Sequence, residues 1–101
     1  MTASELPVVV FAPDLLDRSR IAGVLAGAVF ARRADELPAM AARYVLVDLS
    51  RPGVLDVIPH IAAPVIGFGP HVDDELLAAG MAAGCTEVLP RSRVFRRLES
   101  L

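Results

Sequence analysis

The segment Tyr44-Val45-Leu46-Val47-Asp48 carries the clearest secondary-structure signal in the chain. It is short, rich in β-branched residues and apolar at consecutive positions, which is typical of a strand buried on both faces of a parallel sheet. The strand ends in a carboxylate, and Arg51-Pro52-Gly53 then turns the chain. The segment therefore predicts a central strand of an α/β fold with an acidic group at its carboxyl end.

Similar apolar runs on either side predict four more strands, at residues 6–11, 28–32, 64–68 and 87–89. Patterns with helical spacing separate the strands. They cover residues 15–26 after the N-cap Asp14, a short stretch after the cap Asp35, residues 54–61 with Pro59 inside, residues 73–84, and a last short helix capped by Ser92. Strands that alternate with helices predict one parallel sheet covered on both faces.

Composition fits a single domain over residues 1–101, because 54% of the residues are hydrophobic and can form one core. That content excludes a disordered chain, and the net charge of −2 gives no overall basic field for nucleic acid. One cysteine excludes a disulfide framework. No apolar run approaches the roughly 20 residues of a membrane span, and the N-terminus lacks the basic start of a secretory signal. We expect a cytoplasmic protein with no membrane partner.

Functional groups in such sheets lie beyond the carboxyl ends of the strands. The side chains to inspect there are Ala12, Pro13, Asp14, Asp48, Ser50, Arg51, Gly69, Pro70, His71, Arg91 and Ser92. No nucleotide-binding glycine motif and no recognisable catalytic set occurs, so we expect no cofactor and no enzymatic activity. His60, His71 and Cys85 fall on different predicted elements, so we expect no metal site. We expect Cys85 to pack in the core.

The stretch Val45–Gly53, a strand ending in Asp48 with Pro52 four residues on, resembles the phosphorylation site of response-regulator receiver domains of two-component signalling. Pro64-Val65-Ile66 resembles the family's fourth strand, and Ala79–Leu89 resembles its fourth helix and fifth strand. The resemblance covers Val8 to Leu98 and implies a flavodoxin-like, doubly wound five-stranded sheet of order 2-1-3-4-5. The third and fifth helices would be shortened here.

The residues that carry the family's chemistry differ in this sequence. The two acidic residues that hold Mg²⁺ correspond to Ala12 and Pro13, which supply no side-chain oxygen to a hard cation. The family's hydroxyl residue falls on Gly69, its lysine on Arg91, and its proline behind a cis bond on Ser92. We therefore predict a degenerate receiver, or pseudo-receiver, with a trans bond and a repositioned loop before Ser92. Asp48 would not be phosphorylated efficiently by the Mg²⁺-dependent route.

Two interpretations of Asp48 stay open. It is either the partner of Arg91 in an ion pair, which we favour, or a phosphoacceptor in a phosphorelay, with Asp14 as a replacement metal ligand. A further alternative is a small anionic ligand bound at the strand ends by Asp14, Arg51, Gly69, His71 and Ser92. The arginines at positions 91, 93, 96 and 97 favour a solvated helix over a nucleic-acid site, since Phe95 is the only aromatic residue among them.

The resulting functional prediction is a non-enzymatic regulatory module that binds a protein partner. Receiver domains pair through the fourth helix, fifth strand and fifth helix, so the resemblance implies this surface as the contact face and as a homodimer interface. The short tail after Arg91 also predicts exposed apolar surface there. The residues expected on this face are Leu76, Met81, Val94 and Phe95.

Overall fold

The computed structural model describes residues 2–70 and 72–101. Five parallel strands form one sheet in the order β2-β1-β3-β4-β5, as the resemblance predicted. Because β3 lies at the centre of this order, its carboxyl end is surrounded by loops from both halves of the chain. The strands are β1 (Val9–Phe11), β2 (Val29–Phe30), β3 (Val45–Asp48), β4 (Val65–Gly69) and β5 (Glu87–Pro90).

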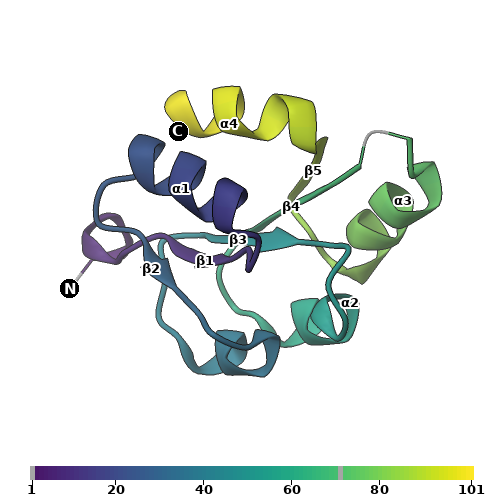
Figure 1. The fold of residues 1–101 in the computed structure, drawn as a ribbon. Helices are drawn as coiled ribbons and strands as arrows, with labels where there is room; N and C mark the ends of the chain where they lie inside the picture. The colour runs from purple at the N-terminus through teal and green to yellow at the C-terminus, as the bar shows by residue number, and fades with distance from the viewer. Residues whose placement is uncertain (1, 71) are drawn as a thin grey trace.

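Helices cover both faces of the sheet (Figure 1). On one face lie α1 (Leu15–Val24) and α4 (Arg91–Glu99). The opposite face carries the 3-10 helix η2 (Ala34–Ala39), α2 (Val54–Val57) with the 3-10 turn η3 (Ile58–His60), and α3 (Asp74–Ala83). A further 3-10 turn, η1 (Ala3–Glu5), precedes the sheet. Within the described residues, no helix is both long enough and apolar enough to cross a bilayer.

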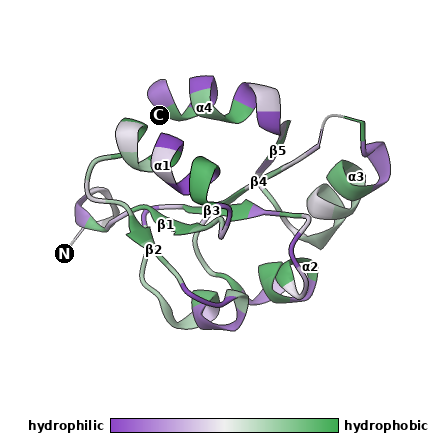
Figure 2. Cartoon of the chain, in the orientation of Figure 1, coloured by the Kyte–Doolittle hydropathy of each residue, from purple (hydrophilic) through white to green (hydrophobic). Residues whose placement is uncertain are grey.

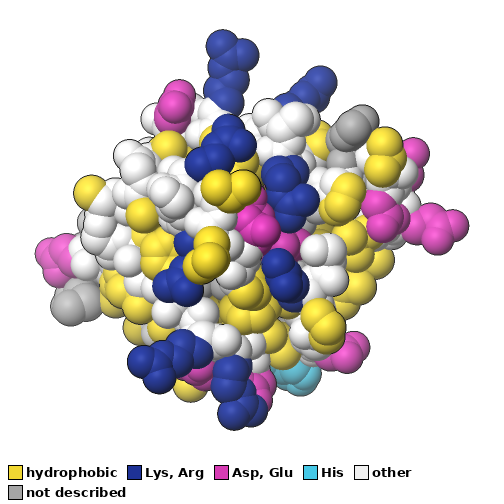
Figure 3. Space-filling view, viewed as in Figure 1, with side chains coloured by type: hydrophobic (Ala, Val, Ile, Leu, Met, Phe, Trp, Pro, Cys, Tyr) yellow, Lys and Arg dark blue, Asp and Glu magenta, His cyan; other side chains and the backbone are white. Residues whose placement is uncertain are grey.

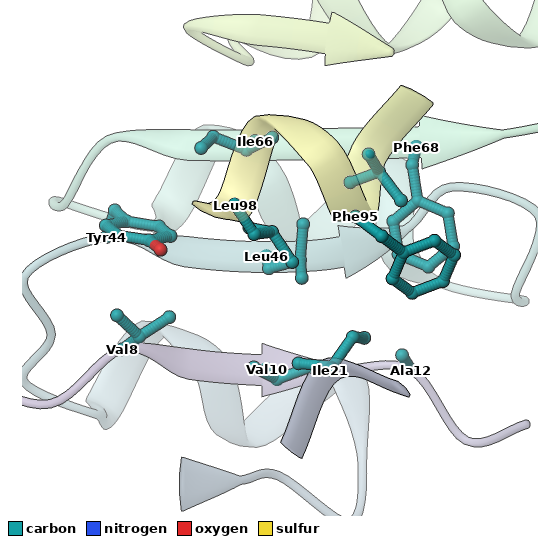
Figure 4. Packing of buried hydrophobic residues seen from close by; sticks show 11 residues of the cluster. Val8, Val10, Ala12, Ile21, Tyr44, Leu46, Ile66, Phe68, Phe95 and Leu98 are labelled. Carbon is teal, nitrogen blue, oxygen red and sulfur yellow. The ribbon is translucent and has the colours of Figure 1, made fainter. Parts of the chain in front are cut away.

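The strands are mostly apolar, apart from Asp48 at the end of β3 and Glu87 at the start of β5, whereas the helices mix apolar and polar positions (Figure 2). Successive residues of β3 point to opposite faces, so Leu46 packs under α1 and α4 while Val45 and Val47 pack on the other side. Figure 4 shows Phe95 and Leu98 of α4 packed over the strands beside Phe68 and Leu46. The central strand is therefore buried on both faces, as its sequence predicted.

Two predicted helix starts are wrong. The segment after Arg33 forms the 3-10 helix η2 instead of an α-helix, and Asp35 lies in its first turn, paired with Arg33, instead of capping it. Pro38 inside η2 removes an N–H donor, which limits the helix to this short form. We predicted that Ser92 caps the last helix, but α4 begins at Arg91 and Ser92 is its second residue.

The junction between β5 and α4 also differs from the prediction. Pro90 ends β5 and occupies the N-cap position of α4, so strand and helix join without a loop. The repositioned loop expected there is absent, and the peptide bonds of the described residues are trans, as predicted for the bond before Ser92. Pro90 favours this direct junction because its fixed φ of −65° suits the residue before a helix. The junction places the Arg91 side chain at the carboxyl end of the sheet.

Candidate functional site: a paired carboxylate edge

Asp48 lies at the carboxyl end of β3, and its side chain is 1% exposed. One carboxylate oxygen, Oδ1, accepts hydrogen bonds from the Ser50 amide at 3.0 Å and from the Ser50 hydroxyl at 2.6 Å. The other, Oδ2, lies 3.2 Å from Nη2 of Arg91 and 3.6 Å from Nε of Arg51. A buried carboxylate is costly unless it is paired, and both oxygens of Asp48 are engaged.

The guanidinium of Arg91 lies between two carboxylates. Its Nη2 is 3.2 Å from Oδ2 of Asp48 and also 3.2 Å from Oδ2 of Asp17, on α1. The guanidinium carbon lies 5.4 Å from the centre of the Phe68 ring, so an aromatic face supports the cation. Arg91 thus joins α4 to the end of β3 and to α1, and the ion pair expected between Asp48 and Arg91 is present.

Asp17 was not among the residues singled out from the sequence, yet it is one of two buried acidic residues among those described. Burial raises the pKa of the Asp17 carboxyl above its ordinary value, and the positive charge of Arg91 opposes that rise. Asp17 Oδ2 has no aligned hydrogen-bond donor among the described protein atoms. The sequence signal for the burial of Asp17 was its position four residues before the apolar Ile21. Residues at that spacing lie on the same face of a helix.

The other residues predicted at this edge do not form a single cluster. Asp14 caps α1 by accepting a hydrogen bond from the Asp17 amide at 3.0 Å. Arg51 lies beside Asp48, and Ser92 is exposed on α4. His71 lies outside the described residues. The structure therefore brings together Asp48, Arg51 and Arg91 from the predicted set, but not all of its members.

Gly69 ends β4, at the position where the resemblance implies a hydroxyl residue, and the packing around it leaves little room for a side chain. A Cβ atom at Gly69 would lie 3.2 Å from Cδ2 of Leu76, which is closer than most such contacts. Leu76 of α3 therefore packs close to the backbone at the position where the family has a hydroxyl group. A serine or threonine at this position would require Leu76 to move.

Two of the four residues predicted on the contact face do not lie on the surface. Val94 and Phe95 are buried in the core beneath α4, because the amphipathic helix turns its apolar side to the sheet. They cannot contact a partner while α4 is packed. Leu76 is half-buried, and Met81 is exposed.

Cys85 packs in the core, as predicted. Burial raises the pKa of its thiol to about 11.

No protein-family model and no curated protein sequence matches the chain. Solved structures do match. The receiver domain of NtrX from Brucella abortus has a TM-score of 0.75 at 20% identity, over 90% of this chain and 90% of that one. The chain has the fold of a response-regulator receiver domain. The receiver fold spans about a quarter of a longer NtrX chain, since a match over 92% of this chain covers 25% of that protein.

Two other response regulators share this receiver fold. Rcp1, solved in a Mn²⁺-bound form, matches with a TM-score of 0.76 at 12% identity, over 94% of this chain and 90% of that one. The phosphorylated cyanobacterial phytochrome response regulator RcpA matches with a TM-score of 0.75 at 14% identity, over 94% and 89%. At these identities the likeness concerns the fold, so the chemistry has to be judged from the residues present.

The residues at this edge do not fit the Mg²⁺ ion that the receiver resemblance implies. Ala12 and Pro13 follow β1 without side-chain oxygens, and Ala12 is buried in the core. The two buried carboxylates, Asp17 and Asp48, already face the Arg91 guanidinium. Among the residues described, no three or more His, Cys, Asp or Glu side chains are placed to hold a metal ion.

Proposed function

We propose that this chain is a pseudo-receiver, a non-enzymatic regulatory module that signals through protein contacts without Mg²⁺-dependent phosphorylation of Asp48. The observation that carries the proposal is the position of Arg91. Its guanidinium lies 3.2 Å from both Asp48 and Asp17, so the chain supplies its own cation to these carboxylates. The helix α4 fixes that cation in place.

Two physical consequences follow for phosphoryl transfer. A divalent ion neutralises the charge that develops on the transferring group, and this is usually a dominant part of catalysis. A guanidinium supplies one positive charge and no open coordination position for a phosphoryl oxygen. In addition, the Asp48 side chain is 1% exposed and both of its oxygens are engaged, so the nucleophile is closed to a phosphodonor.

The test is incubation of the protein with a small-molecule phosphodonor and Mg²⁺, followed by intact-mass measurement. We expect no stoichiometric gain of a phosphoryl group. Asp48→Asn is the matched variant, and RcpA, which has been solved in phosphorylated form, is the positive control. A gain of one phosphoryl group by the wild type but not by Asp48→Asn would favour the alternative of a functional phosphoacceptor.

The hollow that Arg51 lines does not favour the alternative of an anionic ligand. It has a volume of about 420 Å³, and its charged lining residues are Arg51, Asp56 and Asp73. Two carboxylates against one guanidinium give a negative rim, which repels an anion.

A protein partner fits a receiver fold that lacks phosphotransfer chemistry. We expect such a partner to bind the wild type and Asp48→Asn equally, with or without the phosphodonor, because binding would not depend on Asp48 modification. Affinity capture followed by mass spectrometry identifies the partner, and a titration with the purified partner then compares the two forms. Loss of binding in Asp48→Asn with the fold intact would contradict the proposal.

A further inference from the structure

The helices α4 and α3, on opposite faces of the sheet, differ in charge, although the chain as a whole carries only −2. The helix α4 contains four arginines and one glutamate. On the opposite face of the sheet, α3 contains two acidic residues and no basic one, and α2 contains Asp56. Figure 3 shows arginines at the top of the molecule, where α4 lies, and acidic side chains at the right, where α3 lies, with further arginines in the middle and at the bottom.

The surface of α1 and α4, which we call the basic face, combines exposed arginines with exposed leucines. Arg93 and Arg96 project from α4, and Arg20 of α1 stacks on the Phe95 ring at 3.8 Å, which links the two helices. Leu15 and Leu16 open α1 and are 78% and 76% exposed. Isolated exposed leucines are ordinary, but two adjacent ones beside a row of arginines make a contact surface of mixed character.

The surface of α2 and α3, which we call the acidic face, has the complementary character. Its acidic side chains are all exposed: Asp56, Asp73, Asp74 and Glu75. The hollow of about 420 Å³ lies on this face, with Leu55 and Leu76 in its wall and with Asp56, Asp73 and Arg51 as its charged lining residues. Such a hollow suits an apolar side chain next to a guanidinium, and Leu16 and Arg20, one helical turn apart, present that pair.

We propose that the basic face of one copy docks on the acidic face of a second copy of this chain. The partner is a second copy because each molecule carries both complementary surfaces. The arginines of one copy would face the carboxylates of the other, and a leucine would enter the apolar hollow. The two faces lie on opposite sides of the sheet, so the contact joins unlike surfaces and leaves one free face at each end. Such an assembly grows head to tail with concentration, and it weakens with salt because surface charges are screened.

The first test is sedimentation equilibrium over a range of protein concentrations, at low salt and at about 0.5 M salt, where the screening length is a few ångströms. We expect the average mass at low salt to rise with concentration past that of a dimer, and to fall toward the monomer at high salt. A monomer under all conditions would overturn the proposal, and so would a mass that stops at the dimer or ignores salt.

The second test removes the net charge of each face in turn. Arg93→Glu/Arg96→Glu removes the net positive charge of the basic face, and Asp74→Arg/Glu75→Arg removes the net negative charge of the acidic face, so each variant alone should be monomeric. An equimolar mixture of the two should form dimers, because the unchanged acidic face of the first variant can pair with the unchanged basic face of the second. All four positions are exposed, so the fold is retained, and circular dichroism checks this. A mixture that stays monomeric would overturn the proposal.

Discussion

Arg91 is the residue on which the carboxyl edge depends. It reaches two carboxylates, of which Asp48 is fully buried and Asp17 nearly so, while its own side chain is 37% exposed. A pair of this kind gains little over a well-packed apolar core, but removing one partner leaves the other charged and buried. Arg91 therefore matters chiefly because its removal would leave two buried carboxylates without this positive partner.

Replacement of Arg91 by alanine should destabilise the fold by about 2–3 kcal/mol, somewhat below the cost for fully buried pairs because Arg91 is partly exposed. The double variant Arg91→Ala/Asp48→Asn should lose less than Arg91→Ala alone, since one stranded charge is removed. Urea unfolding of the two single variants and the double variant measures the coupling. Arg93→Ala, on the exposed side of the same helix, is the control and should change stability by no more than about 0.5 kcal/mol. Additive losses would argue against the pairing.

The raised pKa of Asp17 makes a prediction about pH. Because burial raises this pKa in the folded state, the folded protein holds the proton more tightly than the unfolded chain, whose value is near 3.8. The contribution of Asp17 to stability is therefore most favourable at low pH and declines as pH rises from 3.8 through the raised value.

The variant Asp17→Asn lacks the titrating carboxyl group, so comparison with the wild type isolates the contribution of Asp17 to the pH dependence of stability. The unfolding free energy of the wild type minus that of Asp17→Asn should fall as pH rises from about 3.8 toward neutrality, since only the wild type carries this proton. Urea denaturation at a series of pH values measures the difference. A difference that grows with pH would mean that Arg91 lowers the pKa more than burial raises it.

At the scale of elements, Leu49 fixes the spacing between the sheet and α3. It follows Asp48 directly, and its side chain fits between two glycines. A Cβ at Gly67 of β4 would lie 2.8 Å from its Cδ2, and one at Gly80 of α3 would lie 2.7 Å from its Cδ1. Both glycines have ordinary φ angles, so the space for Leu49 accounts for them.

Gly67→Ala should therefore destabilise the fold by about 1–3 kcal/mol, the usual cost of overpacking a core. Leu49→Ala alone should cost about 2–5 kcal/mol through the cavity it leaves. The double variant should cost less than the sum, because the alanine methyl at position 67 enters the space that Leu49 vacates. Gly23→Ala, where nothing lies within 4 Å, is the matched control and should stabilise α1 by about 0.5–1 kcal/mol. Strictly additive costs would show that Leu49 does not fill this space.

The elements that sequence predicted best are those with a strong local pattern. The strand ending at Asp48 and the helix capped by Asp14 follow from apolar runs and a capping residue, and both are present. The Leu49 contact with two glycines depends on how elements meet, so no local pattern carries it, and the burial of Asp17 had only its helical spacing to Ile21 as a signal. Val94 and Phe95 were misplaced because a helix pattern gives an apolar face without saying whether it meets the sheet or a partner.

At the scale of the whole molecule, Cys85 reports on the integrity of the core. Its thiol is buried and has a pKa of about 11, and only the exposed thiolate reacts with an alkylating reagent. We expect negligible alkylation of the native protein at pH 8, and modification that follows the unfolding transition as urea is added. Circular dichroism gives that transition independently. Rapid alkylation without urea would show that the layer under α3 opens locally.

The most direct test of the cation role of Arg91 is a titration of the protein with Mg²⁺ followed by two-dimensional proton–nitrogen NMR. The Ser50 amide is the reporter, because it donates to the Asp48 carboxylate at 3.0 Å. With the guanidinium already between Asp17 and Asp48, we expect no saturable shift of this amide. Saturable shifts of Ser50 and its neighbours in the wild type, absent from Asp48→Asn, would show that Mg²⁺ binds beside Asp48 and would contradict this role.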